Sequence, residues 1–261
     1  IDTTRVVKNA DSDILHTLQA YALSWDEPVV YQTQRLDLYQ DVTQTLLKQN
    51  LVYACRCARK QIKTIGGIYQ GHCKSLNHDT TAGALRLVQQ HSTTHFSDLI
   101  QGDINVNKAL AFEDYLIKRS DGLYAYQLVV VVDDIDQGIS RIVRGADLIE
   151  PTARQISLFK QLNSPIPEFA HLPLAVAKPG FKLSKQNYAP AISKQNPKPA
   201  LISAFEFLGL SISADLMDLN IEQLIAWGVK NFSLKQVPKV PEIQISQHPT
   251  HQAVQFTHLS K

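Results

Sequence analysis

The chain has 261 residues, of which 44% are hydrophobic and 19% charged, so it can bury a substantial core. Its net charge of +2 excludes a global positive field, so any contact with nucleic acid must come from a local patch. The sequence shows neither an apolar run of transmembrane length nor a signal peptide, and three cysteines, an odd number, argue against a secreted disulfide scaffold. We therefore expect a soluble cytoplasmic protein without a membrane partner.

The first fifty residues predict scaffold elements. A cluster of capping residues at 11–13 precedes a helical pattern that Pro28 would end. A second amphipathic helix is predicted over residues 37–48. Residues 51–54 then predict a short strand. We assign no chemistry to these elements.

All three cysteines, Cys55, Cys57 and Cys73, fall within nineteen positions. Unrelated buried cysteines would be expected to scatter, so the clustering favours a metal, and thiolate ligands favour zinc. Three structural or free thiols are the alternative. From ligand chemistry His72 is the first candidate for a fourth ligand, although it adjoins Cys73 and the two would converge on one ion with difficulty. Four protein ligands leave no open position for a reacting water, so such a site is structural.

The segment after the cysteines predicts a small mixed sheet. Strand patterns cover residues 85–88, 95–100 and 116–119, with turn residues between them. We expect this sheet to carry the metal site.

Four consecutive valines at 129–132 predict a buried strand by propensity alone. Residues 140–148 predict another strand that ends in a loop, and Arg144 lies toward the end of that strand. An arginine there can hold a carboxylate through two hydrogen bonds, which makes Arg144 a candidate for binding an acidic substrate. The alternative is a salt bridge to Asp147 or Asp134. Tyr126, taken alone, would more often be a core residue.

A helix over residues 151–162 leads into an apolar strand at 171–177, which predicts a strand–helix–strand crossover of parallel strands. The following loop presents Lys182, Ser184 and Lys185. No Asp or Glu occurs between residues 169 and 205, so this basic loop suits a phosphate chain. A solvated lysine loop is the alternative. Two short amphipathic helices are predicted at 198–208 and 221–229, and the polar tail from residue 238 is expected to be loose.

The string Lys-Leu-Ser-Lys at 182–185 resembles the second signature of class I aminoacyl-tRNA synthetases, usually written KMSKS. With Gln-Asn after it and a His-Leu-Pro-Leu strand before it, the string is similar to that of the glutamyl-queuosine tRNA(Asp) synthetase family, a shortened relative of glutamyl-tRNA synthetase. The strings Ile-Gly-Gly-Ile-Tyr at 65–69 and Arg-Gly-Ala-Asp-Leu at 144–148 also match that family.

The resemblance implies an activity and a set of site residues. The activity is ATP-dependent activation of glutamate, followed by its transfer to queuosine in the anticodon of tRNA(Asp). It implies that Lys182 and Lys185 bind ATP and, with Ser184, support catalysis, with Mg²⁺ accompanying the ATP. It also implies that Tyr126 and Arg144 bind glutamate.

For the metal site, the family uses a tyrosine four positions before the last cysteine. The implied zinc ligands are therefore Cys55, Cys57, Tyr69 and Cys73, and His72 remains the other candidate for the fourth position. The resemblance further implies a helix, starting near Tyr124, where propensity predicts the valine strand.

The implied fold is α/β, a Rossmann-type class I synthetase catalytic domain with an inserted zinc-containing α/β subdomain and a short helical C-terminal region. We expect the catalytic domain at 1–54 and 125–190, the insertion at 55–124, and a helical, stem-contact-like region with a polar tail at 191–261. The family's opening segment, with its first strand, HIGH-like motif and part of the amino-acid pocket, would precede residue 1. We expect a monomer.

Two other functions remain open from sequence. The chain could be a truncated ordinary glutamyl-tRNA synthetase, but only 76 residues follow Lys185, which is too few for that enzyme's large helical anticodon-binding domain. It could also be a zinc-stabilised RNA-binding module without catalysis.

Overall fold

The computed structural model describes residues 1, 6–184, 189–246 and 255–257. Its α-helices are α1 (Ala10–Ala20), α2 (Leu36–Lys48), α3 (Arg59–Thr64), α4 (Lys108–Ala111), α5 (Tyr126–Asp136), α6 (Ile149–Gln161), α7 (Lys198–Phe207) and α8 (Ile221–Asn231). Short 3₁₀ helices are η2 (Gln32–Gln34), η3 (Ala146–Leu148), η5 (Ala214–Asp218) and η6 (Leu234–Gln236). The strands are β1 (Val52–Cys55), β2 (Ala84–Leu87), β3 (His95–Asp98), β4 (Gly102–Asn105), β5 (Leu116–Lys118), β6 (Arg141–Gly145), β7 (Glu168–Leu172), β8 (Leu174–Lys178), β9 (Phe181–Lys182), β10 (Glu242–Ser246) and β11 (Gln255–Thr257).

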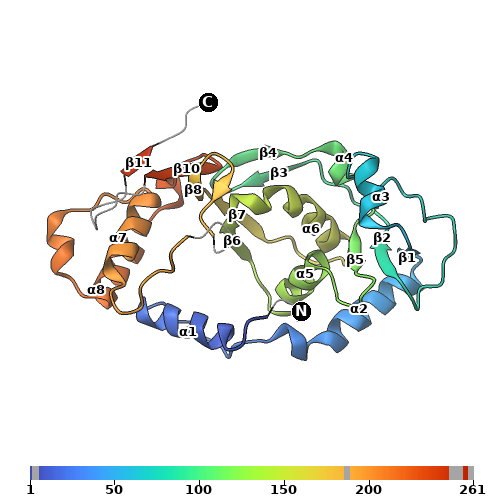
Figure 1. Cartoon of the computed structure of the whole chain (residues 1–261), viewed down its shortest axis with the longest axis horizontal. Coiled ribbons are helices and arrows are strands. Elements are labelled where there is room, and N and C mark those ends of the chain that lie inside the picture. The colour runs from blue at the N-terminus through green and yellow to red at the C-terminus, as the bar shows by residue number, and fades with distance from the viewer. Residues whose placement is uncertain (2–5, 185–188, 247–254, 258–261) are drawn as a thin grey trace.

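The centre of the molecule is a parallel strand pair joined by a helix. β6 pairs with β7 in parallel, and α6 connects them, as the crossover pattern predicted. α5 packs beside α6, and both helices lie between the two ends of an elongated molecule (Figure 1). One end carries β1, β2 and β5 with α2 and α3, and the other carries α7 and α8 (Figure 1).

The strand predicted from the four valines is wrong. Residues 129–132 belong to α5, as the family resemblance implied, and the helix begins at Tyr126, two residues after Tyr124. Four of its apolar side chains are buried in the main core, which explains the outcome, because tertiary burial outweighs β-propensity.

The single apolar strand predicted at 171–177 is also wrong. It is two strands separated at Pro173, which has no backbone N–H to donate to a ladder. β7 belongs with β6, whereas β8 lies in a four-stranded sheet of order β11-β10-β8-β9. The basic loop therefore follows a strand of this second sheet, not of the parallel pair.

The tail predicted as loose contains β10, which pairs with β8 in parallel. Ile243 of β10 is buried, so the alternation of apolar and polar residues at 242–246 decided the structure more than the overall polarity of the tail did. The helix near the N-terminus also starts earlier than predicted. Asn9 precedes α1, so the acidic residues proposed as caps lie in its first turn, where they favour the helix dipole.

The main core runs through both the expected catalytic domain and the expected insertion. Leu46 of α2, Leu87 of β2 and Leu128 of α5 belong to one buried cluster. The expected boundary after residue 54 falls inside β1, which pairs with β2. The division into domains stays a prediction. A second cluster joins α7 and α8 and includes Tyr21. Among the described residues, no helix combines the length and the apolar character needed to cross a membrane.

Candidate active site and metal centre

Arg144 lies near the end of β6 and is held by uncharged groups. Its Nε donates to Nε2 of His171 over 3.1 Å, and its Nη2 donates to Oγ1 of Thr152 and Oε1 of Gln155, both over 2.6 Å. No carboxylate in the described part of the chain forms an ion pair with it, so the alternative of a salt bridge to Asp147 or Asp134 is not what the structure shows. These hydrogen bonds fix the orientation of the guanidinium, and no ion pair with a described residue cancels its positive charge.

Tyr126 is the first residue of α5 and is 46% exposed, so it is not a core tyrosine. Burial lowers the pKa of Arg144, and the nearby Tyr126 hydroxyl, Asp134 and Asp147 oppose that lowering. Tyr126 and Arg144, which are 18 positions apart, therefore lie close together. An exposed hydroxyl beside a fixed guanidinium can bind a carboxylate from two sides.

The basic loop contacts the same region through Asp147. Nζ of Lys182 lies 2.5 Å from Oδ2 of Asp147, which belongs to η3 immediately after β6. The Asp147 carboxylate also attracts the Arg144 guanidinium and acts to raise its pKa. Lys182, Asp147 and Arg144 therefore lie one after another around the end of β6. Ser184 is part of the described loop, and its carbonyl accepts from the Ala189 N–H over 3.1 Å. Lys185 lies outside the described residues.

The partners of Arg144 were not predicted from the sequence. His171 was part of an apolar string, and Thr152 and Gln155 were ordinary positions of a predicted helix. The one available signal was a histidine inside an apolar strand, since a buried imidazole requires a polar partner. His171 is fully buried, and its Nδ1 lies 2.7 Å from Oδ2 of Asp98.

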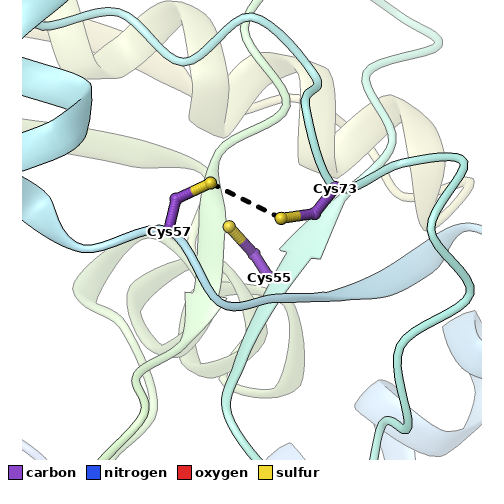
Figure 2. A group of neighbouring side chains, drawn as sticks. All are labelled: Cys55, Cys57 and Cys73. Carbon is purple, nitrogen blue, oxygen red and sulfur yellow. Dashed lines mark hydrogen bonds between the residues drawn. The ribbon is translucent and has the colours of Figure 1, made fainter.

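The three cysteines converge, as their clustering predicted. Their Sγ atoms all lie within 4.8 Å of one another, and those of Cys57 and Cys73 are 3.5 Å apart. Figure 2 shows the three sulfur atoms pointing toward a common centre from β1, the segment after it and the loop that returns with Cys73. All three are free thiols. This donor set fits a thiolate-binding metal such as zinc.

Tyr69 is placed to complete that set, and His72 is not. Tyr69 is 3% exposed and packs against Cys55 and Cys73, and its hydroxyl accepts the Cys73 N–H over 2.6 Å. His72 is exposed and does not belong to the convergent group. Burial raises the pKa of Tyr69 above its usual range, so its phenolate would need a bound cation.

The Cys57 thiol has the same requirement. Burial raises the pKa of Cys57 to about 12, and the neighbouring Cys73 and Cys55 add to the effect. For Cys73, burial also acts to raise the pKa, but hydrogen bonds from the Arg56 backbone, Cys57 and Tyr69 bring it below the usual value. A bound cation would supply the charge that the Cys57 thiolate needs at this buried point.

A polar network joins this group of cysteines and Tyr69 to α6. Glu113 accepts the Tyr69 N–H over 3.0 Å and pairs with Arg154 of α6. The Asp114 carboxylate accepts the Tyr53 hydroxyl over 3.0 Å. Beside the network is an open hollow of about 650 Å³, lined by Ile65, Gly66, Ile68, Tyr69, Gln70, Gly71, Lys74, Gln89, Ala109, Phe112, Glu113 and Asp114.

Comparison with known proteins places the chain among the tRNA synthetases. The family model for the catalytic domain of class I tRNA synthetases (E and Q) matches residues 1–236. The glutamyl-Q tRNA(Asp) synthetase of Colwellia psychrerythraea is 49% identical over 250 residues, which cover 94% of this chain and 79% of the relative. The enzyme of the same name from Photobacterium profundum is 48% identical over 93% of this chain and 78% of the relative.

Solved structures show the same fold. The chain is similar to a glutamate tRNA ligase from Elizabethkingia meningosepticum, in complex with its amino acid, with a TM-score of 0.72 and 20% identity over 92% of this chain. A glutamate-tRNA synthetase from Elizabethkingia anophelis gives a TM-score of 0.73 and 19% identity over 94% of this chain. The chain spans 58% and 59% of the length of these two proteins.

The parallel pair, its crossover helix and the family match define a class I tRNA synthetase catalytic domain with an α/β fold. Two curated relatives of one name, each nearly half identical over more than nine tenths of the chain, narrow that class further. The chain belongs to the glutamyl-Q tRNA(Asp) synthetase family.

Proposed function

We propose that the protein activates glutamate with ATP and transfers the glutamyl group to queuosine in the anticodon of tRNA(Asp). The observation that carries this proposal is Arg144, a guanidinium held in place by uncharged partners beside the exposed hydroxyl of Tyr126. Such a group is suited to the side-chain carboxylate of glutamate, because it offers a fixed positive charge with two-pronged hydrogen bonding.

The chemistry has two steps. An oxygen of the glutamate α-carboxylate attacks the α-phosphorus of ATP, the bond from that phosphorus to the bridging oxygen breaks, and pyrophosphate leaves. A nucleophile of queuosine then attacks the carbonyl of glutamyl-adenylate, loses its proton and releases AMP. Both steps depend more on alignment and charge neutralisation than on acid–base groups.

The basic loop supplies that neutralisation. Lys182 and Lys185 bind the phosphates of ATP, which enters with Mg²⁺, and Ser184 provides a hydrogen bond. The ion pair between Lys182 and Asp147 supports this assignment, since it places one loop ammonium at the end of β6 beside the Arg144 site.

The metal centre has a structural role in this proposal. Cys55, Cys57, Tyr69 and Cys73 hold zinc, which neutralises the ligands and ties the loop of Cys73 to β1. The network from Glu113 to α6 connects this centre to the catalytic part. A cytoplasmic location accords with three thiols that bind metal instead of pairing.

Two assays on the full-length protein test the proposal. The first is glutamate-dependent exchange between ATP and pyrophosphate, which reports adenylate formation. The second is transfer of labelled glutamate to three RNAs: tRNA(Asp) with queuosine, tRNA(Asp) without it, and tRNA(Glu). We expect label only on the queuosine-containing tRNA(Asp). Label on tRNA(Glu) would indicate an ordinary glutamyl-tRNA synthetase, and RNA binding without exchange would indicate a non-catalytic module.

A further inference from the structure

Asp98 and His171 form a buried pair behind Arg144. Both side chains are fully inaccessible to solvent, and Oδ2 of Asp98 lies 2.7 Å from Nδ1 of His171. Oδ1 of Asp98 accepts three backbone N–H groups, from Ile100 over 2.9 Å, Gln101 over 2.8 Å and His171 over 3.2 Å. Burial acts to raise the pKa of Asp98, but the hydrogen bonds from His171 and from these backbone groups bring it below its usual value. The pair is therefore a carboxylate facing an imidazole.

The contacts of the imidazole determine its tautomer. Nε2 of His171 accepts from Nε of Arg144, so Nε2 carries no proton. The proton is then on Nδ1 and is donated to Asp98. Thr152, whose Oγ1 lies 3.1 Å from Nε2, donates its own hydroxyl proton to the Leu148 carbonyl over 2.7 Å and does not compete.

The strand register places these groups side by side. Arg144 of β6 and His171 of β7 are partners in the parallel ladder, and the Leu99 N–H after β3 donates to the Phe169 carbonyl of β7 over 2.8 Å. Asp98 comes from the β3–β4 hairpin, which lies in the segment expected to be inserted. Asp98, which lies outside the parallel strand pair, is thus linked to Arg144 through the imidazole of His171.

We propose that Asp98 and His171 are positioning residues that hold the Arg144 guanidinium ready for the carboxylate of its substrate. This inference rests on the proposed function, in which Arg144 binds glutamate. A free arginine side chain samples many rotamers, and holding Nε and Nη2 in advance reduces the entropy that glutamate binding would otherwise lose. The two N–H groups of Nη1 remain in the fixed plane of the guanidinium.

Asp98→Asn tests the pair with little change of shape. Oδ1 of the asparagine can still accept the three backbone N–H groups, while its amide nitrogen replaces Oδ2. That nitrogen donates to Nδ1 of His171, so the ring proton moves to Nε2, where it opposes the N–H of Arg144. We expect the KM for glutamate to rise roughly 10- to 100-fold, since a hydrogen bond to a charged group contributes about 1.5–3 kcal/mol. The KM for ATP should change less than about twofold.

Two controls accompany this variant. Asp103→Asn is the same substitution on an exposed residue of the same hairpin, and its KM for glutamate should equal that of the wild type. The double variant Asp98→Asn/His171→Gln should recover part of the affinity, because a glutamine amide can turn its carbonyl toward Arg144. ¹⁵N NMR of histidine-labelled protein should show the His171 proton on Nδ1 in the wild type and on Nε2 in Asp98→Asn.

The outcomes separate the two proposals. An active wild type whose KM for glutamate is unchanged in Asp98→Asn would overturn the positioning role alone. Equal increases in both KM values together with a lowered melting temperature would also overturn it, because they indicate a merely structural pair. A wild-type His171 protonated on Nε2 would do the same. Failure of glutamate-dependent exchange in the wild type would instead overturn the proposed function.

Discussion

Lys182 at the end of β9 and Asp147 of η3 form an ion pair across 35 positions of the chain, with 2.5 Å between Nζ and Oδ2. The lysine belongs to the basic loop, and the aspartate follows the strand that ends near Arg144. Both side chains are more than one third exposed, so the pair contributes little to stability. The ion pair instead holds the Lys182 ammonium group beside the candidate amino-acid site.

The first prediction concerns this ammonium group. Lys182→Ala and Lys185→Ala should each lower kcat for ATP–pyrophosphate exchange about 100-fold, the usual loss when one group that stabilises transition-state charge is removed. Unfolding midpoints in urea should stay the same. Lys178→Ala is the matched control, since Lys178 lies over the Phe181 ring of the same hairpin. An equal loss in that control would mean that the loop supplies only general positive charge.

Substitution of Arg144 should affect glutamate and not ATP. Arg144→Ala is expected to lower kcat/KM for glutamate by at least about 100-fold, since it removes a charge-assisted hydrogen-bonding group. Arg144→Lys should lower it also, because one ammonium cannot reproduce the contacts with His171 and Thr152. Steady-state exchange kinetics with each substrate varied in turn measure both effects. Arg141→Ala, on the same strand but exposed and paired with Glu168, should behave like the wild type.

Metal analysis should find one zinc per chain. Tyr69→Phe is expected to weaken zinc binding in a competition with a chelator, whereas His72→Ala should not, because of these two residues Tyr69 alone belongs to the cluster of the cysteines. Zinc must displace protons from thiols, including Cys57 with its pKa raised to about 12, so affinity should fall as the pH falls. The reverse ranking of the two variants would assign the fourth position to His72. Far less than one zinc in the purified wild type would contradict the metal site itself.

Asp134 should make stability depend on pH. Burial raises its pKa from 3.8 to about 6, Arg144 opposes the rise and Asp133 adds to it. Between about pH 4 and pH 6 the folded protein therefore binds more protons at this group than the unfolded chain does, and its contribution to stability falls as the pH rises. Asp134→Asn removes this cost. Its free energy of unfolding at pH 7.5 should exceed that of the wild type by an amount on the order of 1 kcal/mol, because partial exposure reduces the full effect.

Urea unfolding of both proteins at pH 4 and pH 7.5 checks this prediction. The difference in free energy between variant and wild type should be larger at the higher pH. A variant that is less stable than the wild type at pH 7.5 would show that the attraction between Asp134 and Arg144 outweighs the burial of the carboxylate.

Local patterns determined much of the fold. The helical period at 37–48 and 221–229, the helix predicted at 151–162 and the clustering of three cysteines all correspond to observed features, because each is a short-range consequence of side-chain spacing. Patterns failed where distant packing decided the outcome. The four valines are helical because the core surrounds them, and β10 exists because β8 offers it an edge.

The sequence by itself determined which chemical groups the protein has: a basic loop, an arginine after a strand, and a set of thiols. Only the tertiary structure decided what holds Arg144. Its direct partner His171 lies 27 positions after it in the chain, and Asp98, which contacts that histidine, lies 73 positions before His171. No periodicity links residues at such separations, because they become neighbours only through the pairing of β6 with β7 and the packing of β3 against β7.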